Sequence, residues 1–140
     1  MKKIIPILVA LVAAWFYTNE PNPYVEPTST TAPATTTAPV SFVSGSQITG
    51  AGTVVRVLPD DNDGSRHQRF ILRLSSGRTV LVAHNIDLAP RVAGIKGGDT
   101  VEFNGEFESN PQGGVIHWTH HDPHARHVAG WLKHNGRTYQ

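Results

Sequence analysis

Residues 100–120 read TVEFNGEFESNPQGGVIHWTH, and this stretch decides the fold. In its first half, Val101, Phe103 and Phe107 alternate with glutamates and an asparagine. Alternation with a period of two is typical of a β-strand that buries one face and exposes the other. The run NPQGG at 110–114 consists of turn-forming residues. The stretch therefore predicts a strand over 100–108, a turn, and a further strand over 115–120.

The chain before this stretch predicts three more strands. β-branched or alternating apolar residues mark them at 50–58, 69–74 and 79–84. The turn-forming runs PDDNDGS and Ser76-Gly77 separate them, and the connection NIDLAPRVAGIKGGD leaves room for one short helical turn. The expected fold class is therefore mostly β.

Three meandering strands, a connection and a final strand pair resemble the OB fold over residues 46–121. The resemblance implies a small five-stranded barrel in which the fifth strand runs parallel to the third. Another small β-barrel is the alternative. After the fifth strand, Asp122 as N-cap and Pro123 predict a short helix that ends near Gly130. Asn135-Gly136 predicts a C-terminal type I′ hairpin between WLKH and RTYQ.

The N-terminus carries the features of an export segment. Lys2 and Lys3 precede a mostly apolar run within MKKIIPILVALVAAWFY, so residues 1–18 predict a signal peptide or an N-terminal membrane anchor. The choice stays open, because bulky aromatics follow the small Ala13 and Ala14 and the run is short for a membrane span of roughly twenty residues. The expected location is the periplasm, the outer face of the cytoplasmic membrane, or the medium. Only this segment is expected to touch a membrane.

Residues 19–41 are rich in Pro, Thr and Ala and predict a disordered, semi-rigid linker. The folded domain is then expected over residues 42–140. Across the whole chain, 12 Lys and Arg balance 11 Asp and Glu, which argues against a protein that coats polyanions in general. The absence of cysteine excludes disulfides and thiolate zinc sites.

Histidine is the unusual component of the sequence. Five of the eight histidines fall within residues 113–127, GGVIHWTHHDPHARH. In the OB arrangement, the residues that precede strand two and follow strands three and five share one end of the barrel. This end, here called the pole, carries Arg66-His67, residues 84–87 and residues 120–122. The topology therefore predicts that distant histidines meet at one site.

One interpretation of the histidines is a metal centre, because imidazole and carboxylate are the ligands that Zn and similar divalent metals prefer. The candidate ligands are His84, His117, His121, His124 and His127. His117 and His121 would share a strand face, and His124 and His127 would lie one helical turn apart. The alternative is that backbone carbonyls, Asp122 and water satisfy these rings, and no HExxH-type signature is present.

A second interpretation is a site for anions. Arg66, Arg69 and Arg73 lie on or beside the second strand, whose face often carries ligand in OB domains, and guanidinium groups bind phosphate well. Asn85 at the pole is a further candidate ligand-binding residue. Trp118 is a candidate stacking platform for a base. The alternative for the arginines is a solvated strand face.

Four segments resemble a family of short exported bacterial proteins known as a domain of unknown function. These segments are SRHQRFIL, AHNIDLAPR, GDTVEFNGEFESNPQGGVIHWTHHDP and GWLKHNGRTYQ. Together they span nearly the whole predicted domain. The resemblance supplies a family but no activity.

Three functions remain open from the sequence. The first is an exported binding module that presents its His/Arg-rich pole to an anionic ligand, with nucleic acid as the first guess. The second is a metal-dependent phosphodiesterase or nuclease, in which His67, Asp87 and Asp122 are the candidate catalytic or orienting residues. The third is an envelope domain that docks a protein through Trp118, Trp131 and the C-terminal hairpin.

Overall fold

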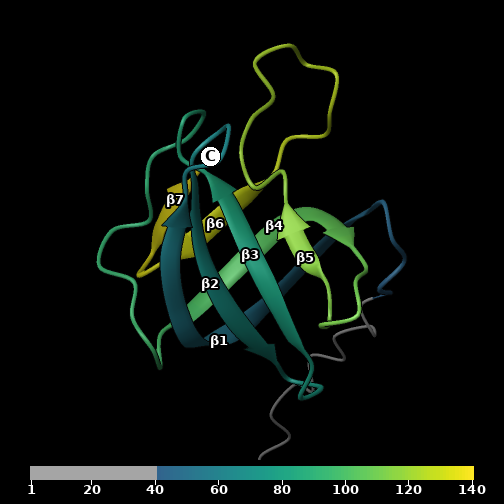
Figure 1. The fold of residues 1–140 in the computed structure, drawn as a ribbon, viewed down its shortest axis with the longest axis vertical. Coiled ribbons are helices and arrows are strands. Elements are labelled where there is room, and N and C mark those ends of the chain that lie inside the picture. The colour runs from purple at the N-terminus through teal and green to yellow at the C-terminus, as the bar shows by residue number, and fades with distance from the viewer. Residues whose placement is uncertain (1–40) are drawn as a thin grey trace, which may run out of the picture. The chain divides into compact units, whose positions relative to one another are not determined.

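A computed structural model describes residues 41–140 of the chain. These residues are built from strands and loops alone, which confirms the mostly β prediction (Figure 1). The strands are β1 (Ser46–Asp61), β2 (His67–Leu74), β3 (Thr79–Asn85), β4 (Thr100–Glu108), β5 (Val115–His117), β6 (Trp131–His134) and β7 (Arg137–Tyr139). The predicted signal or anchor segment, and all but the last residue of the predicted linker, lie outside the described residues.

Five of the strands form a closed ring, and the predicted OB-like topology is confirmed. The neighbours around the ring are β1, β2, β3, β5 and β4, with β4 paired back to β1. All of these pairings are antiparallel except that of β3 with β5, which is parallel as predicted. β1 closes the ring because its first half pairs with β4 and its second half with β2. Register shifts after Val54 and Leu58 allow so long a strand to bend between its two partners.

The apolar face of each strand points into the ring. Phe70, Phe103 and Phe107 are at most 1% exposed, as the alternation in β2 and β4 predicts. Smaller apolar side chains from β1, β3 and β5 fill the space around these three phenylalanines. Polar residues on the opposite faces of β2, β3 and β5 are thereby left on the outer surface, where the candidate site lies.

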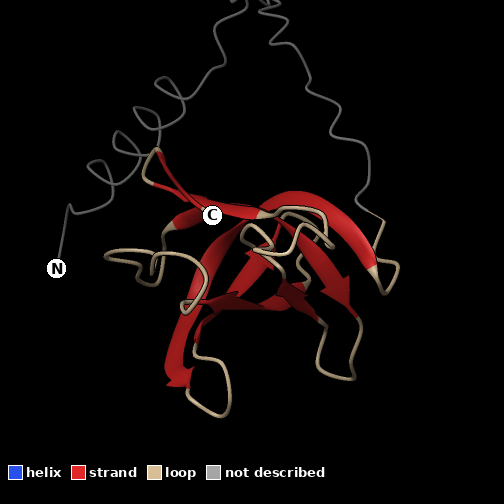
Figure 2. Ribbon diagram, turned by 90° about the horizontal axis from the view of Figure 1, so that it is seen from above, coloured by secondary structure: helices blue, strands red, loops and turns tan. Residues whose placement is uncertain are grey.

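The predicted helix after strand five is wrong. Residues 118–130 form a loop, which projects from the end of the ring to which the arrowheads of β3 and β5 point (Figure 1). Asp122 behaves as a cap, but its carboxylate accepts the backbone N–H groups of His124, Arg126 and His127, and Ala125 turns the chain with φ 51°. The connection from β3 to β4 also contains turns in place of a helical turn, as Figure 2 shows for the described chain.

The fifth strand is shorter than predicted. It ends at His117 because Trp118 has φ 55°, in the left-handed region, which interrupts an extended strand. This change of direction also ends the alternation of faces. The prediction that His117 and His121 share a strand face is therefore wrong.

The predicted C-terminal hairpin is confirmed as β6 and β7. Asn135 and Gly136 both have positive φ, 49° and 76°, as a type I′ turn requires. β6 pairs with β4 over residues 101–104, next to the part of β4 that pairs with β5. The hairpin therefore continues the wall of the ring, and it buries Leu132 and Tyr139 in the core. Nowhere in residues 41–140 is there a helix long and apolar enough to cross a membrane.

Candidate functional site

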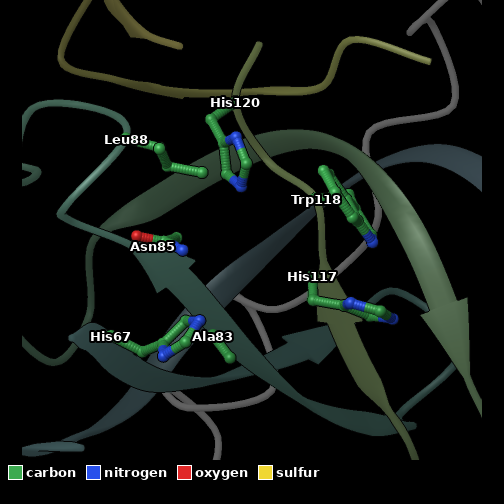
Figure 3. A pocket seen from close by; sticks show the side chains of 7 residues that line it. All are labelled: His67, Ala83, Asn85, Leu88, His117, Trp118 and His120. Atoms are coloured by element: carbon green, nitrogen blue, oxygen red, sulfur yellow. The ribbon is translucent and has the colours of Figure 1, made fainter. Parts of the chain in front are cut away.

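A hollow of about 190 Å³ opens at the pole predicted from the topology (Figure 3). Register explains why distant residues meet there, since His67 pairs with Asn85 across β2 and β3, and the β3–β5 pairing places His117 beside Ala83. The hollow is lined by His67, Ala83, Asn85, Leu88, His117, Trp118 and His120. We refer to it below as the pole hollow.

Two imidazoles point into the pole hollow from different elements, His67 from the start of β2 and His120 from the loop after β5 (Figure 3). The Nδ1 of His67 lies 2.8 Å from the carbonyl oxygen of Ser65, and the Nδ1 of His120 lies 2.7 Å from that of His121. A carbonyl oxygen only accepts hydrogen bonds, so each Nδ1 carries the proton. Each ring is thereby fixed with its Nε2 available to a ligand in the hollow.

A third imidazole, that of His84, is fully buried near the other two. Its Nε2 donates to the carbonyl oxygen of Pro90 at 3.0 Å, and its Nδ1 accepts from the hydroxyl of Thr119 at 2.8 Å. Burial is the main cause that lowers the pKa of His84 to about 4, and the nearby rings of His120 and His67 lower it further. His84 is therefore a neutral packing group with both nitrogens occupied, and it is not free to bind a metal.

Asn85 adds a polar group to the wall of the hollow. Its side-chain oxygen accepts the backbone N–H of Asp87 at 2.9 Å, which leaves the amide nitrogen on the side of the hollow (Figure 3). The hollow thus combines two imidazoles and one amide donor with the apolar surfaces of Leu88 and Ala83. Such a mixture suits a small polar group that is partly removed from water.

Trp118 forms one wall of the hollow and is held from behind by His127. The two rings are stacked, with centroids 4.1 Å apart and planes inclined by 8°. His127 also hydrogen bonds to Glu106 through Nε2 and to the carbonyl of Val128 through Nδ1. Burial opposes the charged form of His127, but the bonds to Glu106 and Val128 outweigh it and raise its pKa. This charged pair fastens the loop 118–130 to β4.

His117 is one of the residues that line the hollow, but its ring points away from the centre of the hollow (Figure 3). Its Nε2 lies 3.4 Å from Glu108 and 3.8 Å from Glu106. The geometry makes no hydrogen bond, and this buried nitrogen has no hydrogen-bonding partner among the described residues. Glu106 therefore lies between two imidazoles, His117 and His127.

The two predicted catalytic carboxylates lie outside the hollow. Asp87 accepts two hydrogen bonds from Arg66, one from the backbone N–H at 2.8 Å and one from the side-chain Nε at 2.7 Å. These bonds lower the pKa of Asp87. Asp122 accepts three backbone N–H groups, the first of them that of His124, which lower its pKa as well. Both carboxylates hold loop backbone in place, and neither is among the residues that line the hollow.

The predicted arginines are spread over the outer surface. The side chain of Arg66 is 58% exposed and is paired with Asp87. Arg69 donates from Nε to the carbonyl of Pro59 at 3.0 Å and lines a second depression of about 350 Å³ over β2 and β3. Arg73 lines a third depression with Gly52 and Thr100, so it does not share the space of Arg69.

Of the five predicted metal ligands, only His117 and His127 are brought near a common residue, Glu106. His84 is buried, His117 and His127 lie beside Glu106, and His121 and His124 are exposed on the loop. Across residues 41–140, no three histidine, aspartate or glutamate side chains surround a point that a metal ion could occupy.

Sequence reasoning did not single out two residues of this region. It places His120 at the pole with the rest of residues 120–122, but it names His121 and not His120 among the candidate ligands. It treats the glutamates of residues 100–108 only as the exposed face of a strand, so the contacts of Glu106 with His117 and His127 are not predicted. The dense histidine run did signal a site, but the turn at Trp118 that selects His120 over His121 leaves no mark in the alternation pattern.

Comparison with known proteins gives one family. The family model described as "Protein of unknown function (DUF3465)" matches residues 26–140, which includes the whole ring and the C-terminal hairpin. No curated protein and no solved structure matches the chain.

Proposed function

We propose that this chain, which belongs to the DUF3465 family, is a binding module that takes an anionic group of its ligand into the pole hollow, with nucleic acid as the first guess. One observation carries the proposal. The imidazoles of His67 and His120 are each fixed through Nδ1 and turn the Nε2 edge toward the same hollow. Two fixed imidazoles, once protonated, provide two directed N–H donors for one oxyanion.

An anion in the hollow is expected to bind more tightly in mild acid, because imidazole side chains as a class gain positive charge there. Titratable groups near the rings include the buried His84, His117 in the wall, and the Arg66–Asp87 pair beside His67. His84 stays neutral, so it adds no competing charge.

The outer face of β2 offers a path for the rest of a chain-like ligand. His67 and Arg69 lie on this face in alternate positions, and the second depression continues it past Ile71 and Leu81. A single strand with one phosphate in the pole hollow would then lie along β2 beside Arg69, with its bases on apolar side chains. OB-like domains bind single strands on this face with similar combinations of cations and flat surfaces.

The direct test is fluorescence anisotropy with a labelled single-stranded DNA oligonucleotide and the full chain. We expect binding to strengthen from pH 7.5 to 5.5 and to weaken as salt rises, because phosphate contacts release counterions. His67→Gln and His120→Gln should each weaken binding at pH 5.5 by roughly 10-fold, the loss of about 1.5 kcal/mol expected for a charged hydrogen bond. His121→Gln is the matched control, since His121 is exposed and serves His120 only through its backbone carbonyl.

Two results would contradict the proposal. One is affinity that depends on neither pH nor salt. The other is equal weakening by His120→Gln and His121→Gln, which would place the ligand on the loop surface and not in the hollow. The metal-dependent nuclease, the protein-docking domain and the export of the chain stay predictions, and a chelator added to the same titration separates the first of them from metal-free binding.

A further inference from the structure

We infer that the pole hollow also cleaves RNA without a metal ion, with His67 and His120 acting as an acid–base pair on one phosphodiester. This inference rests on the proposed function, because the phosphate must first occupy the hollow. It adds a reaction and a substrate class, namely RNA as opposed to DNA.

The arrangement of the two rings provides both halves of acid–base catalysis. With Nδ1–H held by a backbone carbonyl, the neutral ring presents a lone pair at Nε2 and the protonated ring presents an N–H at the same atom. His67 and His120 share this arrangement, and they come from separate elements on separate walls of the hollow (Figure 3). A phosphodiester between them can therefore present its neighbouring hydroxyl to the base and its bridging 5′ oxygen to the acid.

The reaction that fits this pair is transfer of the phosphate to the neighbouring 2′-hydroxyl. One neutral imidazole removes the proton of the 2′-hydroxyl as its oxygen attacks phosphorus. The P–O5′ bond breaks, and the other, protonated imidazole donates its proton to the departing 5′ oxygen. The products are a 2′,3′-cyclic phosphate and a 5′-hydroxyl, and the proton taken up by one ring balances the proton given by the other.

RNA is favoured because it carries its own nucleophile. The attacking oxygen is already next to phosphorus, so no activated water is needed, and the reaction gains from proximity. The amide nitrogen of Asn85 faces the hollow and can donate to a non-bridging phosphate oxygen. DNA lacks the 2′-hydroxyl and should bind in the same place without being cleaved.

The test uses the full chain with an RNA oligonucleotide and a DNA oligonucleotide of the same sequence, both in excess EDTA. We expect cleavage of the RNA with a 2′,3′-cyclic phosphate end, while the DNA binds and remains intact. His67→Gln and His120→Gln should each lower the cleavage rate at saturating RNA at least about 100-fold, the usual contribution of a general acid or base. His121→Gln, purified in the same way, should keep the rate.

The outcomes separate this inference from the proposed function. If DNA binds in a His120-dependent manner but RNA is not cleaved, the inference is overturned and the binding function stands. If neither nucleic acid binds, both are overturned. Cleavage that EDTA abolishes, that includes DNA, or that persists in both glutamine variants also overturns the inference. His67 is only half-buried at the start of β2, so its variant gives the answer even if His120→Gln does not fold.

Discussion

At His84, burial keeps an imidazole neutral and turns it into a packing group. Its ring is 0% exposed and joins β3 to Pro90 in the next connection and to Thr119 after β5. A charged ring in this position would lose hydration without gaining a charged partner, which explains the lowered pKa. The same residue type at His67 and His120 keeps one free nitrogen, so local partners decide which histidines are structural.

The pKa of His84 predicts how stability depends on pH. The ring has a pKa of 6.5 in the unfolded chain and about 4 in the fold, so the unfolded chain binds more protons between these values. The neutral ring therefore contributes its full stabilisation above pH 6.5. As the pH falls toward 4, the free energy of unfolding drops by up to about 3 kcal/mol on account of this ring. Urea unfolding at pH 7 and pH 5 should show a smaller difference for His84→Gln than for the parent chain. An equal difference would contradict this account of His84.

Gly130 predicts a second effect at the scale of one residue. A Cβ atom there would overlap the carbonyl oxygen of Trp118 and lie 2.5 Å from that of Asn104, and backbone atoms cannot rotate away. Gly130→Ala should therefore lower the free energy of unfolding by about 1–3 kcal/mol, as overpacking usually does. Gly97→Ala is the control, because the nearest atom, the carbonyl oxygen of Val54, would be 4.0 Å away. Similar urea midpoints for the two variants would refute the close packing at Gly130.

Among the elements, the loop 118–130 gives the pole hollow both Trp118 and His120. It has no regular hydrogen-bonding pattern, so its shape depends on side chains: the cap at Asp122, the stack of His127 on Trp118, and the bond from His127 to Glu106. The shape of the pole hollow therefore depends on the shape of this loop. Because the pairing of His127 with Glu106 is strongest when His127 is protonated, the shape of the loop depends on pH.

We expect the loop to loosen as the pH rises. The pKa of His127 is raised in the fold, so the stabilisation that it provides is complete below the ordinary histidine pKa and is lost as the pH passes the raised value. Glu106→Gln should lower the pKa of His127, measured by NMR, and speed amide exchange in residues 122–127. Glu102→Gln on the same strand is the control, since Glu102 faces Lys133 at 3.8 Å. An unchanged His127 titration in Glu106→Gln would contradict the proposed fastening.

For the fold of residues 41–140 as a whole, the C-terminal hairpin extends the wall of the ring from β4. Leu132, His134 and Tyr139 are at most 4% exposed, and His134 bonds to Asp99 at 2.9 Å. Deleting residues 131–140 should therefore abolish the cooperative thermal transition, because losing one buried leucine alone costs about 2–5 kcal/mol. Deleting Gln140 alone, an exposed residue, should leave the transition in place. A truncated chain that keeps its cooperative transition would contradict this structural role of the hairpin.

Much of this architecture was predictable from the sequence, because strand alternation and turn residues are local signals. Val101, Phe103 and Phe107 identified β4, and Asn135-Gly136 identified the hairpin. The pole was predictable as soon as β3 and β5 were placed parallel. The role of each histidine was not predictable, because it depends on the residues around its ring. Thr119 decides the role of His84, and Glu106 decides that of His127. The left-handed backbone of Trp118 decides which way His120 points.

The central claim is that His67 and His120 share one ligand, and imidazole NMR tests it most directly. The full chain with ¹⁵N-labelled histidine would be titrated with a single-stranded DNA oligonucleotide while the ring nitrogens are followed. We predict that the Nε2 signals of His67 and His120 shift together with one dissociation constant, while those of His121 and His124 stay unchanged. Shifts confined to His121 and His124, or no shift at His67 and His120 while the DNA is bound, would contradict the account.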